Sequence, residues 1–211
     1  MVQICQHPLI ETKLSLMRDK QTPTAIFRDC LEEITYLMSF YVFEHSELIQ
    51  KPKHITTPTG ATLYPKRLKD KVLFVPVLRA GLGMLTPMLK LIPTAEVGYL
   101  AIARDEATLK SIKYYEKIPA LDNPQVVILE PMLATGGSLI QTLDTLKEAG
   151  FTRFKVVSII AAPEGIAKIK AKHPDINIYI CSLDENLNEH GFIMPGLGDV
   201  GDRLYGFPEE R

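Results

Sequence analysis

The sequence is organised around short, uninterrupted runs of apolar residues, many of which are β-branched. Strands that are buried on both faces have this composition, whereas strands with one solvent-facing side alternate apolar and polar residues. The runs therefore predict the parallel strands of a buried central sheet. They occupy residues 72–78, 97–103, 126–129, 156–162 and 176–181.

Helical patterns lie between these runs. Residues 138–149 place three leucines on one stripe and are followed by Gly150, a good residue for a helix C-terminus. Residues 163–172 have a similar apolar stripe and stop before Pro174. Because strand and helix patterns alternate, we expect an α/β fold with an open, mostly parallel sheet flanked by helices.

Both ends of the chain depart from this alternation. Residues 22–43 have helical spacing after Pro23, and residues 53–64 predict a β-hairpin around a Pro-Thr-Gly turn. The glycine-rich stretch 191–211 has no clear period and is expected to be an ordered loop. The chain is thus predicted to be one domain over residues 1–211. Its core spans about 65–185, and a small hood is drawn from 1–64 and 186–211.

Composition excludes several classes of protein. The 24 lysines and arginines are balanced by 25 acidic residues, which argues against a nucleic-acid binder that relies on bulk positive charge. No apolar run is long enough for a membrane span, and residues 1–13 do not resemble a signal peptide. The three cysteines form no CxxC pair and predict reduced thiols. We therefore expect a soluble, cytoplasmic protein with no membrane or nucleic-acid partner.

The segment 126–138 carries the strongest chemical signal. A buried strand ends at Glu130, and a loop of small residues, Ala134 to Ser138, then opens a helix. Backbone N–H groups in such a loop, together with the positive end of the helix, can surround a phosphate. The segment is not a Walker P-loop, because the GxxxxGK[ST] spacing is missing. On composition alone, a plain strand-to-helix turn remains an alternative.

Taken residue by residue, this segment resembles the ribose-5-phosphate-binding motif of type I phosphoribosyltransferases, and in particular their uracil phosphoribosyltransferase branch. The residues that carry the resemblance are Glu130, Pro131, Met132, Leu133, Ala134, Thr135, Gly136, Gly137 and Ser138. Further blocks similar to that branch occur in the same order along nearly the whole chain, at 7–9, 79–84, 161–165, 187–191, 194–199 and 201–202.

The resemblance implies the type I phosphoribosyltransferase fold and a glycosyltransferase reaction. Uracil and 5-phosphoribosyl 1-diphosphate (PRPP) would give UMP and diphosphate, a step of pyrimidine salvage. Magnesium would be carried mainly by the diphosphate of PRPP, since the five histidines have no metal-ligand spacing. The resemblance also implies a homodimer or larger homo-oligomer. Some relatives bind GTP as a regulator, which this sequence does not reveal.

Site residues follow from the same resemblance. The nine residues from Glu130 to Ser138, with Arg79, Arg104 and Asp199, would bind PRPP, and Arg104 and Asp199 would act in catalysis. Uracil would be recognised through the main chain of Ile193, Gly198, Asp199 and Val200.

The residues themselves add two observations about these positions. Arg79 follows the run 72–78 directly, at the strand end where open α/β sheets bind ligands. Residues 196–201 match GxGxxG, but the match is rejected as a dinucleotide motif. The segment lies close to the C-terminus, is expected to open no helix, and leaves no room for a βαβ unit.

Three positions depart from the family pattern. Glu130 stands where aspartate is usual, Ala107 replaces a second acid in the loop after Arg104, and Phe192 replaces a frequent tyrosine. Glu130 and Ala107 motivate an alternative from another class, a UMP- or RNA-binding regulator with little or no turnover. A third possibility keeps the enzyme and changes the base to a purine, which would need a wider pocket.

Overall fold

The computed structural model describes residues 1–104 and 111–206. A parallel sheet with the strand order β1-β13-β12-β10-β6-β7 forms its centre, and β11 pairs with β12. These strands are β1 (Val2–Ile4), β6 (Val72–Pro76), β7 (Glu96–Val97), β10 (Gln125–Leu129), β11 (Met132–Leu133), β12 (Phe154–Ala161) and β13 (Asn177–Leu183). The predicted open parallel sheet is confirmed.

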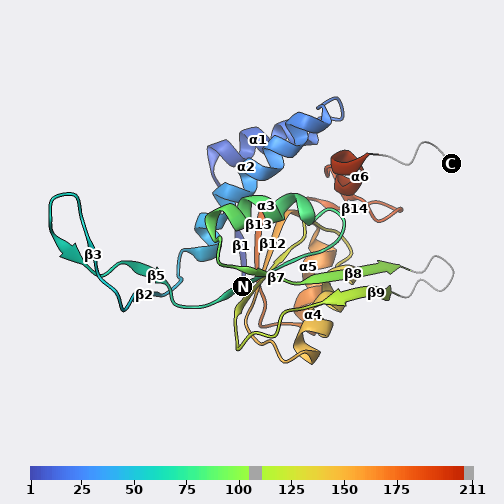
Figure 1. Ribbon diagram of the computed structural model, residues 1–211. Coiled ribbons are helices and arrows are strands. Elements are labelled where there is room, and N and C mark those ends of the chain that lie inside the picture. Colours follow the sequence, from blue (N-terminus) through green and yellow to red (C-terminus); the bar gives the residue numbers. More distant parts are fainter. Residues whose placement is uncertain (105–110, 207–211) are drawn as a thin grey trace.

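Helices cover both faces of this sheet (Figure 1). Alternate residues of β6 and β10 enter two different cores: Phe74 and Val127 face the helices α1, α2 and α3, whereas Val75 and Ile128 face α4 and α5. This double burial explains why the strands contain no polar alternation. The helices are α1 (Pro8–Arg18), α2 (Thr24–Phe43), α3 (Leu82–Leu91), α4 (Gly137–Glu148), α5 (Pro163–Lys172) and α6 (Val200–Tyr205).

The chain reverses its direction of travel across the sheet between β6 and β10. From β6 it passes through α3 to β7 at one edge, whereas from β10 it passes through α4 to β12 and through α5 to β13 on the other side. The loops after β6 and β10 therefore diverge from neighbouring strand ends. Open α/β sheets bind ligands at such a switch point.

Two antiparallel pairs form an arm that projects from the body (Figure 1). One pair is β2 (Leu48–Gln50) with β5 (Lys66–Leu68), and the other is β3 (Ile55–Thr56) with β4 (Thr62–Leu63). The predicted hairpin at 53–64 is confirmed by the outer pair. Another small pair, β14 (Asn186–Leu187) with β15 (Ile193–Met194), lies in the hood.

Two expectations are wrong. The run 97–103 is not one buried parallel strand: β7 (Glu96–Val97) joins the sheet, Leu100 makes a single parallel bridge to Val77, and β8 (Tyr99–Arg104) pairs antiparallel with β9 (Ser111–Lys117). The C-terminal stretch is not all loop, because Asp199 accepts a hydrogen bond from the Asp202 N–H and begins α6. The expectation that the GxGxxG match opens no helix is therefore wrong. Helix α6 has only six residues, which are too few to show a helical period in the sequence.

Helix α1 and strand β1 are additional to the predicted elements. The signals for α1 are local: Pro8 stands at its first turn, and the His7 side chain accepts a hydrogen bond from the Leu9 N–H. Among the described residues, no helix is both long and apolar enough to cross a membrane. All three cysteines are buried and unpaired, as expected.

Candidate active site

The loop after β10 forms a cradle at the start of α4. Gly136 has φ +72° and stands at the N-cap of α4 without a capping side chain, and the Gly137 N–H makes a long hydrogen bond of 3.5 Å to the Thr135 hydroxyl. The first backbone N–H groups of α4 and its positive dipole end are therefore available to an anion. The cradle encloses about 130 Å³ and is lined by Glu130 and by every residue from Met132 to Leu139.

A second helix supports this cradle from behind. Gly165, in the first turn of α5, packs so closely on the loop that a Cβ atom there would lie 2.1 Å from the Ala134 carbonyl oxygen. Only glycine permits that approach. The position of the phosphate loop therefore depends on α5, which the sequence block at 161–165 suggested only through resemblance.

Glu130 lies at the end of β10 with its side chain partly covered. The backbone N–H of Met132 donates to its carboxylate, which by itself lowers the pKa. Loss of solvent around the carboxylate is the larger effect and raises the pKa of Glu130 to about 8. Near neutral pH the free protein thus holds a substantial fraction of Glu130 protonated.

Arg79 follows β6 and reaches across to the hood. Its guanidinium donates to the Asp202 carboxylate over 2.6 Å, and the Asp202 N–H donates to the Asp199 carboxylate over 2.9 Å. The Arg79 side chain is 57% exposed, so the guanidinium can also contact a ligand in solvent. Asp202 therefore joins two predicted site residues, a link that the sequence analysis did not assign.

The hood forms a second cavity of about 150 Å³. It is lined by Gly191, Phe192, Ile193, Leu197, Gly198 and Asp199 from the hood and by Met132, Ala134 and Ile160 from the core. Three of the four residues predicted for the base thus lie together. Val200 does not line the cavity, because it is buried at the start of α6.

The two cavities adjoin each other. Met132 and Ala134 line both, so the two cavities are neighbours along the same loop. The sequence analysis missed Ile160 and Leu197 as lining residues. Their apolar side chains are typical of core positions and carry no chemical signal.

Comparison with known proteins identifies this arrangement. The family model described as "Uracil phosphoribosyltransferase" matches residues 4–207. The chain belongs to the uracil phosphoribosyltransferase family. A uracil phosphoribosyltransferase from Streptococcus mutans is 46% identical over 205 residues, which cover 97% of both chains. One from Halalkalibacterium halodurans is 44% identical over 206 residues, which cover 97% of this chain and 98% of its own.

Solved structures share the same fold. The AQ2163 protein from Aquifex aeolicus superposes with a TM-score of 0.90 at 39% identity, and the match covers 98% of both chains. A hypoxanthine phosphoribosyltransferase from Staphylococcus aureus superposes with a TM-score of 0.51 at 13% identity, covering 77% of this chain and 75% of its own, and supports the fold alone.

Membership of the uracil phosphoribosyltransferase family confirms the resemblance, the type I phosphoribosyltransferase fold and the prediction of a pentosyltransferase enzyme. It does not favour the regulator alternative. Two positions named in the sequence analysis lie outside the described part of the chain. Arg104 is the last residue of β8 but its side chain is not described, and Ala107 is not described at all.

Proposed function

We propose that this chain transfers the 5-phosphoribosyl group from PRPP to uracil, giving UMP and diphosphate in pyrimidine salvage. The observation that carries the proposal is the pair of adjoining cavities, which share Met132 and Ala134. One cavity is an anion cradle and the other is a small hood pocket. A nucleotide has this shape, with a phosphate at one end and a base at the other.

The PRPP end is assigned to the cradle and to Arg79. Backbone N–H groups and hydroxyls of residues 134–138 would bind the 5-phosphate, and Pro131, Met132 and Leu133 would form the wall beside the ribose. Glu130 would accept hydrogen bonds from the ribose hydroxyls in its ionised form. Arg79, by exchanging Asp202 for the diphosphate, would stabilise the leaving group as its charge develops.

Arg104 and Asp199 are proposed as the catalytic residues. Arg104 ends β8 and would contact the diphosphate from the loop that follows. Asp199 lines the hood pocket and is linked through Asp202 to Arg79, so it lies between the base and the diphosphate arginine.

The uracil end is assigned to the hood pocket. Main-chain groups of Ile193, Gly198 and Asp199 would pair with the carbonyl and imide edge of uracil; Val200, predicted with them, does not line this pocket. The pocket, at about 150 Å³, is smaller than the roughly 300–1,000 Å³ of drug-sized ligand sites, which favours a single-ring base over a purine. A base lacking the matching hydrogen bonds would leave buried polar groups unpaired, which can cost about 10⁴-fold in kcat/KM.

Magnesium fits this site as a partner of the substrate. Among residues 1–104 and 111–206, no three His, Cys, Asp or Glu side chains gather around a possible metal position. Glu130 and Asp199 offer single carboxylates at the two cavities, which suits an ion that arrives on PRPP with most of its ligands from diphosphate and water. When bound, magnesium supplies charge neutralisation to the departing diphosphate.

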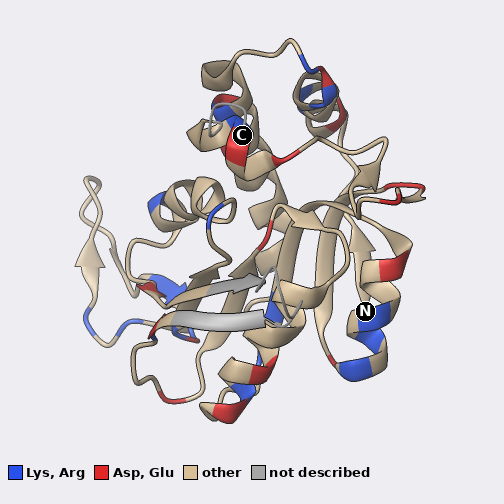
Figure 2. Ribbon diagram, turned by 90° about the vertical axis from the view of Figure 1, so that its right-hand side faces the viewer, with Lys and Arg blue, Asp and Glu red and all other residues tan. Residues whose placement is uncertain are grey.

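We propose that residues 1–211 act as one domain in a cytoplasmic homodimer or larger homo-oligomer. Apolar side chains exposed on α2 and the arm support self-association: Phe40 is 78% exposed and Leu48 is 57% exposed. Basic and acidic residues are interspersed in Figure 2, which supports the absence of a nucleic-acid partner. GTP binding stays a prediction from the resemblance.

The deciding experiment measures UMP formation from radiolabelled uracil, PRPP and Mg²⁺. Parallel reactions contain cytosine, hypoxanthine or no metal. We expect turnover with uracil and metal only. If no base is converted by protein that still binds UMP, the proposed activity is wrong; if hypoxanthine is the preferred base, the hood pocket has been misassigned.

A further inference from the structure

The segment of the hood that lines the base pocket is held by the end of α1, almost the whole chain away. Arg18 is the last residue of α1, and one guanidinium nitrogen donates to the Gly196 carbonyl over 2.8 Å. The same nitrogen and its neighbour donate to both carboxylate oxygens of Asp184, over 2.8 Å and 2.6 Å. Asp184 in turn accepts from the Gly196 N–H over 3.0 Å. Both backbone groups of Gly196 are therefore bound by this pair.

This pair is set in the protein interior. The Asp184 side chain is 1% exposed and the Arg18 side chain 25% exposed. The Ser182 hydroxyl donates to Asp184 Oδ1 over 2.8 Å, while the Gly196 N–H donates to Oδ2. Bidentate charge-assisted contacts of this kind fix the angle of both partners as well as their distance. The contacts therefore hold Gly196 in one orientation.

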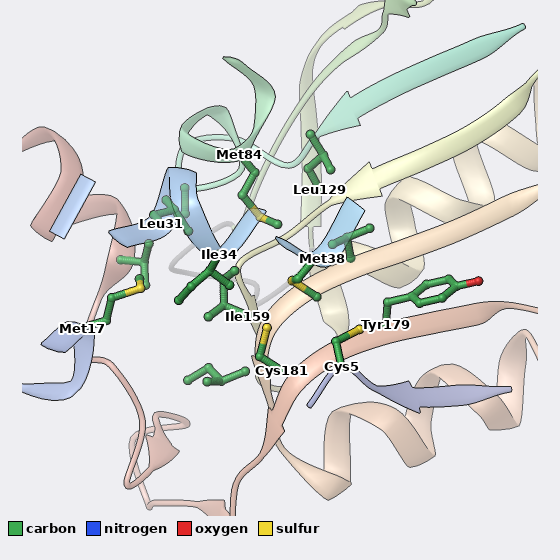
Figure 3. Close-up of a cluster of buried hydrophobic side chains, with 14 of the residues drawn as sticks. Cys5, Met17, Leu31, Ile34, Met38, Met84, Leu129, Ile159, Tyr179 and Cys181 are labelled. Carbon is green, nitrogen blue, oxygen red and sulfur yellow. The ribbon is translucent and has the colours of Figure 1, made fainter. Parts of the chain in front are cut away.

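A second arginine makes the next residue of the loop dependent on α1 as well. Arg203 donates to the Leu197 carbonyl over 3.0 Å and to the Asp19 carbonyl over 2.7 Å, and it also bonds the Met17 carbonyl. Its guanidinium lies 4.0 Å from the centre of the Phe27 ring. Met17 is itself fully buried against α2 in the core shown in Figure 3. Residues Met17, Arg18 and Asp19 at the end of α1 thus form a platform that is anchored in the core.

The platform ends beside the proposed recognition groups. Gly196 and Leu197 directly precede Gly198 and Asp199, which line the hood pocket. In contrast, the phosphate cradle belongs to the loop after β10, whereas the Arg18 guanidinium and the Asp184 carboxylate hydrogen-bond each other, Ser182 and Gly196. Loss of the Arg18 side-chain contacts should therefore affect uracil binding more than PRPP binding.

We infer that Arg18 and Asp184 are positioning residues that hold the Gly196–Asp199 backbone in register for uracil. The inference rests on the proposed role of the hood pocket. Main-chain recognition cannot be adjusted by side-chain rotation, so its accuracy depends on what anchors the backbone. If their role were purely structural, substituting them would lower the free energy of unfolding and change the KM values for uracil and PRPP equally.

The test compares Arg18→Gln and Arg18→Lys with wild type. Glutamine removes the bidentate contacts, while lysine keeps the charge beside Asp184. The matched control is Lys13→Gln, which lies on the same helix and loses only an ion pair of 2.7 Å with Glu33 on α2. Gly198→Ala, which strains the loop itself at φ +68°, reports whether the pocket binds uracil at all. KM for uracil and for PRPP is measured for each folded variant. Calorimetry then compares the binding of UMP with that of ribose 5-phosphate.

We expect Arg18→Gln to raise the KM for uracil by about 10- to 100-fold, since displacements near 1 Å cost this much, with the PRPP KM within about twofold. The uracil KM of Arg18→Lys should lie between those of wild type and Arg18→Gln, and that of Lys13→Gln should equal the wild-type value. UMP binding should weaken while ribose 5-phosphate binding persists. If Gly198→Ala raises the uracil KM and both Arg18 variants do not, or if both KM values rise equally, the positioning role is refuted. If Gly198→Ala also leaves uracil unaffected, the pocket assignment fails and the inference falls with it.

Discussion

The contact between α5 and the phosphate loop makes a sharp prediction for Gly165→Ala. The added Cβ would lie 2.1 Å from the Ala134 carbonyl oxygen and 3.1 Å from that of Leu133, whereas Cβ contacts below 3.0 Å are essentially never observed. Helix and loop must separate by about 1 Å, a misplacement that can cost about 10²-fold in rate. Overpacking of this kind also lowers the free energy of unfolding, by about 1–3 kcal/mol.

The assay is kcat/KM for PRPP at saturating uracil, with thermal unfolding recorded on the same samples. Gly98→Ala is the matched control, because its Cβ would meet the nearest atom, in Val75, at an ordinary 3.5 Å. We expect a fall of about 10²-fold for Gly165→Ala and little change for Gly98→Ala. If folded Gly165→Ala keeps the PRPP parameters of the control, then the loop does not depend on α5 for its geometry.

Three further changes test separate parts of the site. Burial raises the pKa of Glu130 to about 8, so kcat/KM for PRPP should increase as the pH rises toward 8 and ionises the carboxylate. Glu130→Gln should have a lower kcat/KM for PRPP that does not rise with pH. A wild-type kcat/KM that does not change with pH would contradict the role of Glu130 in PRPP binding. Asp202→Asn should lower the KM for PRPP by about two- to fivefold, because diphosphate no longer competes with an exposed ion pair for Arg79; a higher KM would mean that Asp202 orients Arg79 instead. In Gly196→Ala, the Cβ would lie 2.0 Å from the Ile193 carbonyl oxygen at φ +70°. Its uracil KM should rise at least about tenfold while the PRPP KM holds, and a parallel rise in both would argue against a separate base loop.

The central sheet could be predicted because its strands are governed by local composition. Strands β6, β10, β12 and β13 overlap the predicted apolar runs, and α5 begins and ends at the predicted residues because Pro163 and Pro174 mark its limits. The phosphate cradle was predictable for a similar reason. Its acid, its small residues and its helix start are contiguous, so the pattern can be seen without knowing the fold.

The rest of the site depends on contacts between distant segments. Arg79 and Asp202 are 123 residues apart, and Arg18 and Gly196 are 178 apart. No local pattern encodes either pair. Helix α6 is too short for periodicity, and the apolar run at 97–103 has the same composition whether it joins the sheet or, as observed, turns into the β8–β9 ribbon. These differences are decided by tertiary packing.

The arrangement of α6 implies that the hood is shared by both substrates. Within about one helical turn, Asp199 lines the base pocket, Asp202 binds Arg79, and Arg203 holds the Leu197 carbonyl. A ligand that displaces Asp202 from Arg79 therefore acts on the helix that also fixes the base loop. Since residues that share contacts couple energetically, changes in α6 should affect both PRPP and uracil. The Arg18 side chain instead hydrogen-bonds Asp184, Ser182 and Gly196, which precede α6, and this is why its substitution should separate the two substrates.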